Sequence, residues 1–254
     1  KNKINILREF NDDKWGRLVS YFHDKDEITI DELEAKYDNL DQIEPYYENN
    51  NFYITLNRNI LSKHLNYYSK FIQKYNYNNP SIVELGAGYG SKILGISKFD
   101  NFSKNSLIAA EYTENGRALL HKASNSCNNK VIVGGCDFNK CKVDKDLIPE
   151  DSIIFTSYAL MCIPFIEDKL IDFFIELKPK VIINFEPCYE LYDSITPHDI
   201  MCKKYIEING YSKNIYSAIK KKSMKGDCQL LGVSHKVVSF NPFVPISAIE
   251  WKPN

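Results

Sequence analysis

From residue 81 onward, short apolar runs alternate with longer stretches in which apolar residues recur every three or four positions. Short apolar runs predict strands buried on both faces, and the longer spacing predicts helices. The predicted parallel strands cover residues 81–85, 106–110, 130–134, 152–156 and 181–185. Two further strands, 228–240 and 246–251, flank a connection with two prolines, which favours an antiparallel pair. The pattern is typical of an α/β fold.

Residues 1–80 lack this alternation. Helical spacing predicts helices over 7–23, 28–36 and 59–75, with Thr29 as the N-cap of the second. Between the last two lies the aromatic and polar stretch 45–53, which has two interpretations. It is either a loop packed on the sheet edge or a lid over a binding site, in which case Tyr46, Tyr47 and Tyr53 are candidate substrate contacts.

Composition narrows the possible partners. The chain of 254 residues has 32 basic and 33 acidic side chains, so no overall field attracts nucleic acid or an anionic membrane. No apolar run approaches the roughly 20 residues that span a bilayer, and the first residues lack the pattern of a secretion signal. Seven cysteines without metal-ligand spacing indicate reduced thiols, no metal and a cytoplasmic location.

The segment 82–90 carries the strongest chemical signal. An apolar run ending in Glu84-Leu85 is followed by glycines at positions 86, 88 and 90, and a helix is predicted over 91–99. Glycines allow a tight turn and a close approach of backbone to ligand, and a helix start favours polar or anionic ligands. Ser91 stands where a dinucleotide-binding loop has its third glycine, and no P-loop Lys-Ser/Thr pair is present.

The E-x-G-x-G-x-G pattern at 84–90 resembles motif I of the class I S-adenosylmethionine-dependent methyltransferases. The run Leu177-Lys178-Pro179 before the fifth strand is similar to the corresponding segment of small-molecule members. The resemblance implies a Rossmann-like, seven-stranded, mostly parallel sheet with an antiparallel C-terminal pair, plus an N-terminal helical segment. It implies S-adenosylmethionine as cofactor, with the methionine end held by Glu84, Gly86, Ala87, Gly88 and Gly90.

Acids at the ends of the next two strands complete the predicted cofactor site. Glu111 follows the glycine loop by about twenty residues, the interval of a ribose-binding carboxylate in open α/β folds, and Tyr112 is its neighbour. By the resemblance, Asp137 binds the adenine amino group and Phe138 offers a backbone N–H or a stacking face. A simple Asx turn is the alternative for Asp137.

Candidates for acceptor chemistry follow the fourth and fifth strands. By the resemblance, Ser157 and Tyr158 occupy the position of motif IV, beside the transferred methyl group, although the segment lacks the Asn/Asp-Pro-Pro-Tyr/Phe signature. Both could contact cofactor or substrate, with Ser157 a candidate for cofactor binding and Tyr158 for catalysis. Glu186 follows the fifth strand, with Glu190 about one helical turn later. Carboxylates there suit a cationic or N–H-bearing acceptor, whereas the alternative is a solvated helix start.

A helical insertion over about 195–222 provides the remaining candidates. His198 is a possible base or an ordinary residue at a helix start, and the break around Asn209 and Tyr211 is either a substrate frame or a simple helix junction. Residues 1–80 then form a helical lid and residues 81–254 the catalytic domain. The catalytic candidates are Glu186, Tyr158 and His198.

The sequence therefore predicts a methyltransferase that acts on a nitrogen or oxygen of a small molecule or modified peptide. Catalysis would rest on positioning and exclusion of water, because the sulfonium already carries a good leaving group. Two alternatives remain. One is an aminopropyl transferase acting on a polyamine, and the other is a catalytically silent cofactor-binding scaffold. Neither the acceptor nor the oligomeric state follows from the sequence.

Overall fold

The computed structural model describes residues 6–254 of the chain. Its central parallel strands are β3 (Ile82–Leu85), β4 (Leu107–Glu111), β5 (Val131–Asp137), β7 (Ile153–Ser157) and β8 (Val181–Glu186). An antiparallel pair, β9 (Cys228–Ser239) and β10 (Ile246–Pro253), continues the sheet beyond β8. These seven strands confirm the predicted Rossmann-like sheet and its C-terminal pair.

Three further strands extend this sheet. The hairpin of β1 (Ile43–Glu48) and β2 (Asn51–Leu56) pairs with the end of β9, and the short β6 (Lys142–Val143) pairs with β5. The complete order is β2-β1-β9-β10-β8-β7-β3-β4-β5-β6. The stretch 45–53 is therefore part of a β-hairpin instead of a loop, and this hairpin lies at the edge of the sheet. Asn49 and Asn50 both have positive φ, 47° and 65°, which matches the twist of a two-residue hairpin turn.

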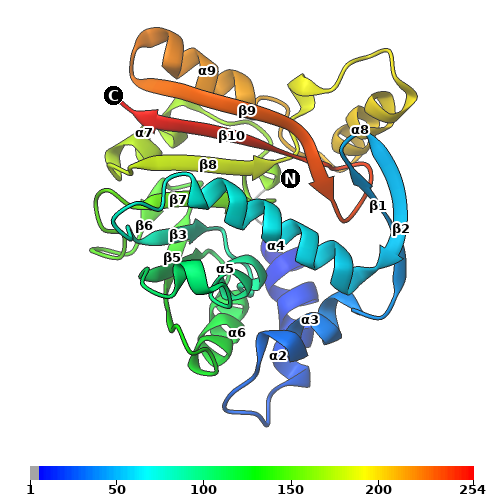
Figure 1. Cartoon of the computed structure of the whole chain (residues 1–254), viewed down its shortest axis with the longest axis vertical. Helices are drawn as coiled ribbons and strands as arrows, with labels where there is room; N and C mark the ends of the chain where they lie inside the picture. Colours follow the sequence, from blue (N-terminus) through cyan, green and yellow to red (C-terminus); the bar gives the residue numbers. More distant parts are fainter. Residues whose placement is uncertain (1–5) are drawn as a thin grey trace.

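Helices cover both faces of the sheet (Figure 1). One face packs against the helices η1 (a π-helix, Leu7–Trp15), α2 (Gly16–Tyr21), α3 (Ile30–Asp38), α4 (Asn57–Gln73), α5 (Ser91–Ile96) and α6 (Glu114–Asn125). The other face packs against α7 (Asp168–Glu176) and α9 (Ile215–Lys225). Ile82 and Val83 belong to opposite cores, because successive side chains of a strand point to opposite faces.

The remaining helical elements are α8 (Pro197–Ile208) and the short turns η2 (Asp100–Phe102), η3 (Leu160–Cys162) and η4 (Tyr189–Leu191). Thr29 caps α3 as predicted: its hydroxyl accepts the Glu32 N–H, and the Glu32 carboxylate accepts the Thr29 N–H in return. No helix within residues 6–254 is long and apolar enough to cross a membrane. All seven cysteines are free thiols.

The parallel strands bring their carboxyl ends to one edge of the sheet. β3 lies between β4 and β7. From β3 the chain adds β4 and β5 on one side, and then β7 and β8 on the other side. Ligands of open α/β sheets bind where the strand order reverses in this way. The segments after β3, β4, β5 and β7 are therefore the ones to search for a binding site.

Candidate functional site

A cavity of about 470 Å³ lies at this edge of the sheet. The segments after β3, β4, β5 and β7 form its floor, and the N-terminal elements and the β9–β10 connection contribute its walls. Its lining residues are Ile6, Phe10, Lys14, Trp15, Tyr37, Asp38, Glu84, Gly86, Ala87, Gly88, Tyr89, Ser91, Lys92, Glu111, Tyr112, Thr113, Phe138, Asn139, Ser157, Tyr158, Ala159, Met161, Cys162, Ile163, Tyr205, Tyr211, Phe240, Asn241 and Val244.

The glycine loop needs its glycines for two reasons. Gly86, Gly88 and Gly90 have φ values of 77°, 57° and 90°, in the left-handed region that side chains disfavour. At Gly86 a Cβ atom would also lie 2.5 Å from the Ala159 Cβ. The backbone between β3 and α5 therefore approaches the segment after β7 more closely than any side chain would permit.

Glu111, at the end of β4, holds this loop in place. One carboxylate oxygen accepts the Gly88 N–H at 2.8 Å. The other accepts the Thr113 N–H at 2.8 Å and the Thr113 hydroxyl at 2.7 Å. The side chain lines the cavity beside Tyr112. A carboxylate is thus fixed at the wall of the cavity, at the end of the strand next to β5.

Glu84 is a buried carboxyl group that also faces the cavity. One of its oxygens accepts the Ile93 N–H at 2.9 Å. Burial raises the pKa of Glu84 to about 8, although the Lys92 ammonium opposes this shift. Asp38 lies on the same wall, accepts the Tyr89 hydroxyl at 3.0 Å and has a pKa raised by burial. The cavity therefore contains carboxyl groups whose charged forms a cationic ligand would stabilise.

At the end of β5, Phe138 and Asn139 line the cavity. The neighbouring Asp137 lies outside the lining, and its Oδ1 accepts the Asn139 N–H at 3.0 Å. The Asx turn considered from the sequence is thus present. Phe138 also lies 3.3 Å from the position that a Cβ of Gly86 would take, so the turn after β5 touches the glycine loop.

The segment after β7 contributes the predicted residues Ser157 and Tyr158 to the cavity. Ser157 Oγ lies 2.8 Å from the Tyr68 hydroxyl. Tyr158 has a positive φ of 53°, and its hydroxyl donates to the Val244 carbonyl at 3.4 Å. Burial raises the pKa of Tyr158 well above its usual value. Ser157 and Tyr158 are thus both held in place by residues that are distant in the sequence, Tyr68 and Val244.

Glu186 lies behind this segment and outside the cavity lining. Its carboxylate accepts the backbone N–H groups of Ala159 and Leu160, both at 3.0 Å, and of Met161 at 3.2 Å. Burial raises the pKa of Glu186 to about 7, and the Leu160 N–H opposes this shift. The side chain therefore holds the backbone of η3, which in turn forms the cavity wall.

Of the other predicted residues, only Tyr211 lines the cavity. Those that lie elsewhere are Tyr46, Tyr47, Tyr53, Glu190, His198 and Asn209. His198 Nε2 lies 2.7 Å from the Pro242 carbonyl, and its ring stacks on Tyr47 at 4.1 Å between centroids. The Glu190 carboxylate accepts the Ser217 N–H, and the Asn209 amide donates to the Tyr205 carbonyl.

Aromatic residues of the N-terminal segment are the main part of the site that sequence reasoning missed. Trp15 lies against Tyr37 and Tyr89, each at 5.2 Å between ring centroids, and the Trp15 ring comes within 3.1 Å of the position a Gly88 Cβ would take. Phe10 and Trp15 stand out in the sequence only as apolar positions on one helix face. That pattern indicates a packed face without saying that the face also borders a cavity.

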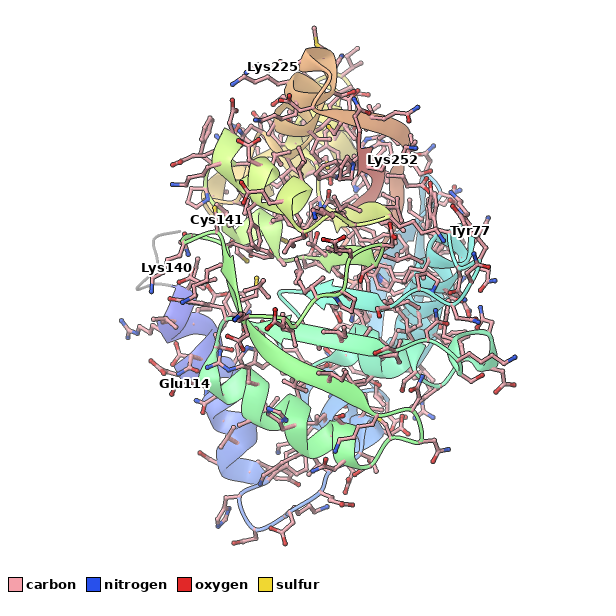
Figure 2. All side chains as sticks on the ribbon, turned by 90° about the vertical axis from the view of Figure 1, so that its left-hand side faces the viewer. Tyr77, Glu114, Lys140, Cys141, Lys225 and Lys252 are labelled. Atoms are coloured by element: carbon pink, nitrogen blue, oxygen red, sulfur yellow. The ribbon has the colours of Figure 1, made fainter. Side chains whose placement is uncertain are left out.

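Two hydrogen bonds join the N-terminal segment to α6. The Asn115 N–H donates to Asn11 Oδ1 at 3.0 Å, and the Asn115 side-chain amide donates to the Asn11 carbonyl at 2.8 Å. Figure 2 labels Glu114 in the first turn of α6, beside the N-terminal segment. Within residues 6–254, no three His, Cys, Asp or Glu side chains gather in a way that would hold a metal ion.

No protein-family model and no curated protein matches the chain. Solved structures do match. The magnesium protoporphyrin IX methyltransferase ChlM from Synechocystis PCC 6803, with bound SAH, is 13% identical with a TM-score of 0.56, over 78% of this chain and 87% of that one. The small RNA methyltransferase HEN1 is 13% identical with a TM-score of 0.57, over 79% of this chain and 26% of HEN1.

The plantazolicin methyltransferase BpumL, in complex with a monoazolic desmethylPZN analog and SAH, is 12% identical with a TM-score of 0.50, over 100% of both chains. The chain thus spans the whole of BpumL but about a quarter of HEN1. Identities this low establish the fold alone. The protein has the fold of the class I S-adenosylmethionine-dependent methyltransferases.

Proposed function

We propose that the protein is an S-adenosylmethionine-dependent methyltransferase whose acceptor is a nitrogen or oxygen atom of a small molecule or modified peptide. The observation that carries this proposal is the meeting of the Gly86–Gly90 loop with Glu111 at one cavity. A left-handed glycine backbone and a fixed carboxylate, on neighbouring strand ends, suit the amino-acid and ribose parts of one nucleoside ligand.

In this proposal the methionine end of the cofactor contacts Glu84, Ala87 and the glycine backbone. Glu111 accepts the ribose hydroxyls, with Tyr112 beside it, and Phe138 borders the adenine. Asp137 remains the candidate partner of the adenine amino group, although it lies outside the cavity lining and its Oδ1 accepts the Asn139 N–H. Lys92 is an additional candidate, because its ammonium group lies on the same wall and suits the cofactor's carboxylate.

The charges of the cavity support a cationic ligand. Its lining contains the carboxyl groups of Asp38, Glu84 and Glu111 and the ammonium groups of Lys14 and Lys92. Lys14 is already paired with Glu9, at 3.1 Å, which leaves the acids in excess. S-adenosylmethionine carries one net positive charge, contributed by its sulfonium. A bound cation would stabilise the charged forms of these carboxyl groups, whose pKa values burial raises for Glu84 and Asp38.

When bound, the cofactor supplies an electrophilic methyl group with a neutral thioether as leaving group. The chain would hold the acceptor in line with that methyl group and exclude water. Aromatic side chains that line the cavity, including Trp15, Tyr205 and Phe240, suit the second role. The N-terminal segment would act as the lid, because η1 borders the cavity and is fastened to α6.

The acceptor side of the cavity lies between η3, the junction after α8 and the β9–β10 connection. Tyr158 and Tyr211 are the predicted candidates that reach it. Glu186 would act as a positioning residue for η3, and His198 as a packing partner of the hairpin. ChlM, HEN1 and BpumL are methyltransferases of a porphyrin, small RNA and plantazolicin respectively, so the fold accommodates several acceptor classes.

Calorimetric titration with S-adenosylmethionine and S-adenosylhomocysteine tests this proposal. We expect saturable binding of both, abolished in Gly88→Val, whose side chain would meet the Trp15 ring at a left-handed backbone position. Gly226→Val, also left-handed but in open space, serves as the control. Absence of binding by the folded wild-type protein would refute the proposal. Transfer of an aminopropyl group from decarboxylated cofactor would instead favour the polyamine alternative.

A further inference from the structure

A chain of three hydrogen-bonding side chains runs from the cavity into the interior. Ser157 Oγ lies 2.8 Å from the Tyr68 hydroxyl, and that hydroxyl lies 3.3 Å from His64 Nδ1. His64 and Tyr68 are fully buried and lie one turn apart on α4, which packs along the sheet (Figure 1). Ser157 is the member of this chain that lines the cavity.

The direction of these hydrogen bonds follows from the chemistry of the buried groups. Burial and the nearby Lys92 lower the pKa of His64 well below its usual value, so the ring is neutral and has one N–H. Burial raises the pKa of Tyr68, so the phenol keeps its proton. A phenolic O–H is a stronger donor than a serine O–H, and a bare imidazole nitrogen is a stronger acceptor than a hydroxyl. Tyr68 therefore donates to His64 Nδ1.

Because Nδ1 accepts from Tyr68, the single proton of neutral His64 lies on Nε2. Within the part of the chain that the structure describes, this buried Nε2 has no hydrogen-bond partner. With Nδ1 bare and Tyr68 donating to it, the Tyr68 oxygen accepts the proton of Ser157. The Ser157 oxygen then presents its lone pairs to the cavity.

We propose that Ser157 accepts a hydrogen bond from an N–H group of the methyl acceptor, and that Tyr68 and His64 fix the serine in this accepting orientation. The substrate class is then a neutral amine with at least one N–H. This inference rests on the proposed methyltransferase activity and narrows its acceptor from nitrogen or oxygen to nitrogen. Ser157 would touch the substrate, whereas Tyr68 and His64 are positioning residues.

Proton balance favours nitrogen over oxygen. An attacking hydroxyl must lose its proton as the new bond forms. The inner end of the Ser157–Tyr68–His64 hydrogen-bond chain is a buried imidazole that resists protonation. The cavity carboxyl groups of Asp38, Glu84 and Glu111 already accept hydrogen bonds from the protein and are assigned above to the cofactor. A neutral amine attacks with its lone pair: the N–CH₃ bond forms, the C–S bond breaks, and its electron pair remains on sulfur. The product ammonium keeps the proton until it releases it to water. The hydrogen-bond chain of Ser157, Tyr68 and His64 needs only to orient the amine.

The tautomer is the first test, and it requires neither acceptor nor turnover. We expect ¹⁵N NMR of the protein with bound S-adenosylhomocysteine to show His64 neutral, with Nε2 protonated and Nδ1 bare. A proton on Nδ1 would reverse the direction of these hydrogen bonds and overturn the proposal. Binding of S-adenosylhomocysteine itself is measured separately, so failure of the methyltransferase assignment is distinguishable from failure of this inference.

Three probes that differ only in the number of methyl groups on nitrogen test the preference for N–H. Aniline, N-methylaniline and N,N-dimethylaniline are neutral at pH 7.5, and only the last lacks an N–H. In titrations of the S-adenosylhomocysteine complex, we expect the first two to bind at least 5-fold more tightly than the third, and Ser157→Ala to remove this preference. Equal binding of all three to wild type, no binding by any of them, or a preference that persists in Ser157→Ala contradicts the proposal.

A double-mutant cycle tests whether Tyr68 acts through Ser157. Tyr68→Phe should reduce the N–H preference of wild type several-fold and have no further effect in the Ser157→Ala background. Tyr67→Phe, which removes a neighbouring hydroxyl that accepts from Asn49, should leave the preference intact. Additive effects of Tyr68→Phe and Ser157→Ala would show that Tyr68 is merely structural. Circular dichroism verifies that each variant folds.

Discussion

The carboxylate of Glu111 accepts the backbone N–H of Gly88 across 2.8 Å, and this contact joins the ends of two neighbouring parallel strands. The same carboxylate binds the backbone and hydroxyl of Thr113. Three donors thus fix an acid at the cavity wall before any ligand arrives. Such preorganisation reduces the ordering cost that binding must overcome.

Replacing this acid should weaken cofactor binding. Glu111→Gln keeps one acceptor oxygen but turns an NH₂ group toward a backbone or hydroxyl donor. We expect a loss of at least tenfold in affinity for S-adenosylhomocysteine, about 1.4 kcal/mol, measured by calorimetry. Glu114→Gln changes an exposed acid three residues away and should have no effect. Unchanged affinity in Glu111→Gln would remove this residue from the proposed ribose site.

Alanine substitutions at two glycines with positive φ distinguish the cost of backbone strain from the cost of a steric clash. Gly86→Ala and Gly226→Ala both place a Cβ at positive φ, which costs about 1–2 kcal/mol. Only at Gly86 would the new Cβ also lie 2.5 Å from another Cβ, that of Ala159. We expect urea denaturation to show a larger loss of stability for Gly86→Ala, together with lost cofactor binding. Equal losses in both variants would indicate that the loop opens freely.

The stability of the unliganded protein should fall as pH rises above 7. Burial raises the pKa of Glu84 from 4.5 to about 8, so between these values the native state binds more protons than the unfolded state. The free energy of unfolding then decreases with rising pH through that range. His64 and His235, whose pKa values are lowered, act in the opposite direction near their unfolded pKa of 6.5.

Urea titrations between pH 7 and 8.5 lie above the range of the histidines, and comparison with a Glu84 variant identifies the contribution of this carboxyl group. We expect the decline to be shallower in Glu84→Gln, while Glu114→Gln retains the wild-type slope. Bound S-adenosylmethionine should also flatten the decline, because a cation beside Glu84 favours the charged carboxylate. A wild-type stability that rises across this window would contradict the assignment.

Loosening the N-terminal segment should speed cofactor release. Asn115→Ala removes the amide that donates to the Asn11 carbonyl. One such hydrogen bond contributes about 0.5–1.5 kcal/mol, which corresponds to a roughly 2- to 10-fold change in rate if the bond breaks during release. Stopped-flow tryptophan fluorescence measures the rate, because Trp15 borders the cavity whereas the other tryptophan, Trp251, is buried in the core. Asn125→Ala, at the opposite end of α6, is the control. Equal rates of cofactor release in wild type and Asn115→Ala would exclude a lid motion of η1.

Glu186 should affect η3 rather than proton transfer. In Glu186→Gln, the carbonyl oxygen and NH₂ group replace a carboxylate that accepts three backbone N–H groups. An unsatisfied buried donor costs about 1–3 kcal/mol, so we expect a lower melting temperature accompanied by reduced turnover. Glu176→Gln, at the end of α7, is an exposed control. Full stability with abolished turnover would instead favour a direct catalytic role.

Local patterns in the sequence were sufficient for the sheet and one wall of the cavity. Apolar runs identified the five parallel strands, and the glycines after β3 identified the turn that needs positive φ. The hairpin β1–β2 was missed because Pro45 and a run of three asparagines resemble a loop. The Asn49-Asn50 pair, both residues with positive φ, was the available signal for a hairpin turn.

The sequence by itself determined which residues follow each strand, because strand and turn preferences depend on neighbours along the chain. Only the tertiary structure decided which side chains meet at the cavity. Trp15 and Tyr37 border it because the N-terminal helices pack over the glycine loop. His198 lies away from it because α8 packs on the hairpin, and Glu186 turns its charge to the η3 backbone. These placements depend on packing between segments that are distant in the sequence. The spacing of apolar residues within one segment does not reveal such packing.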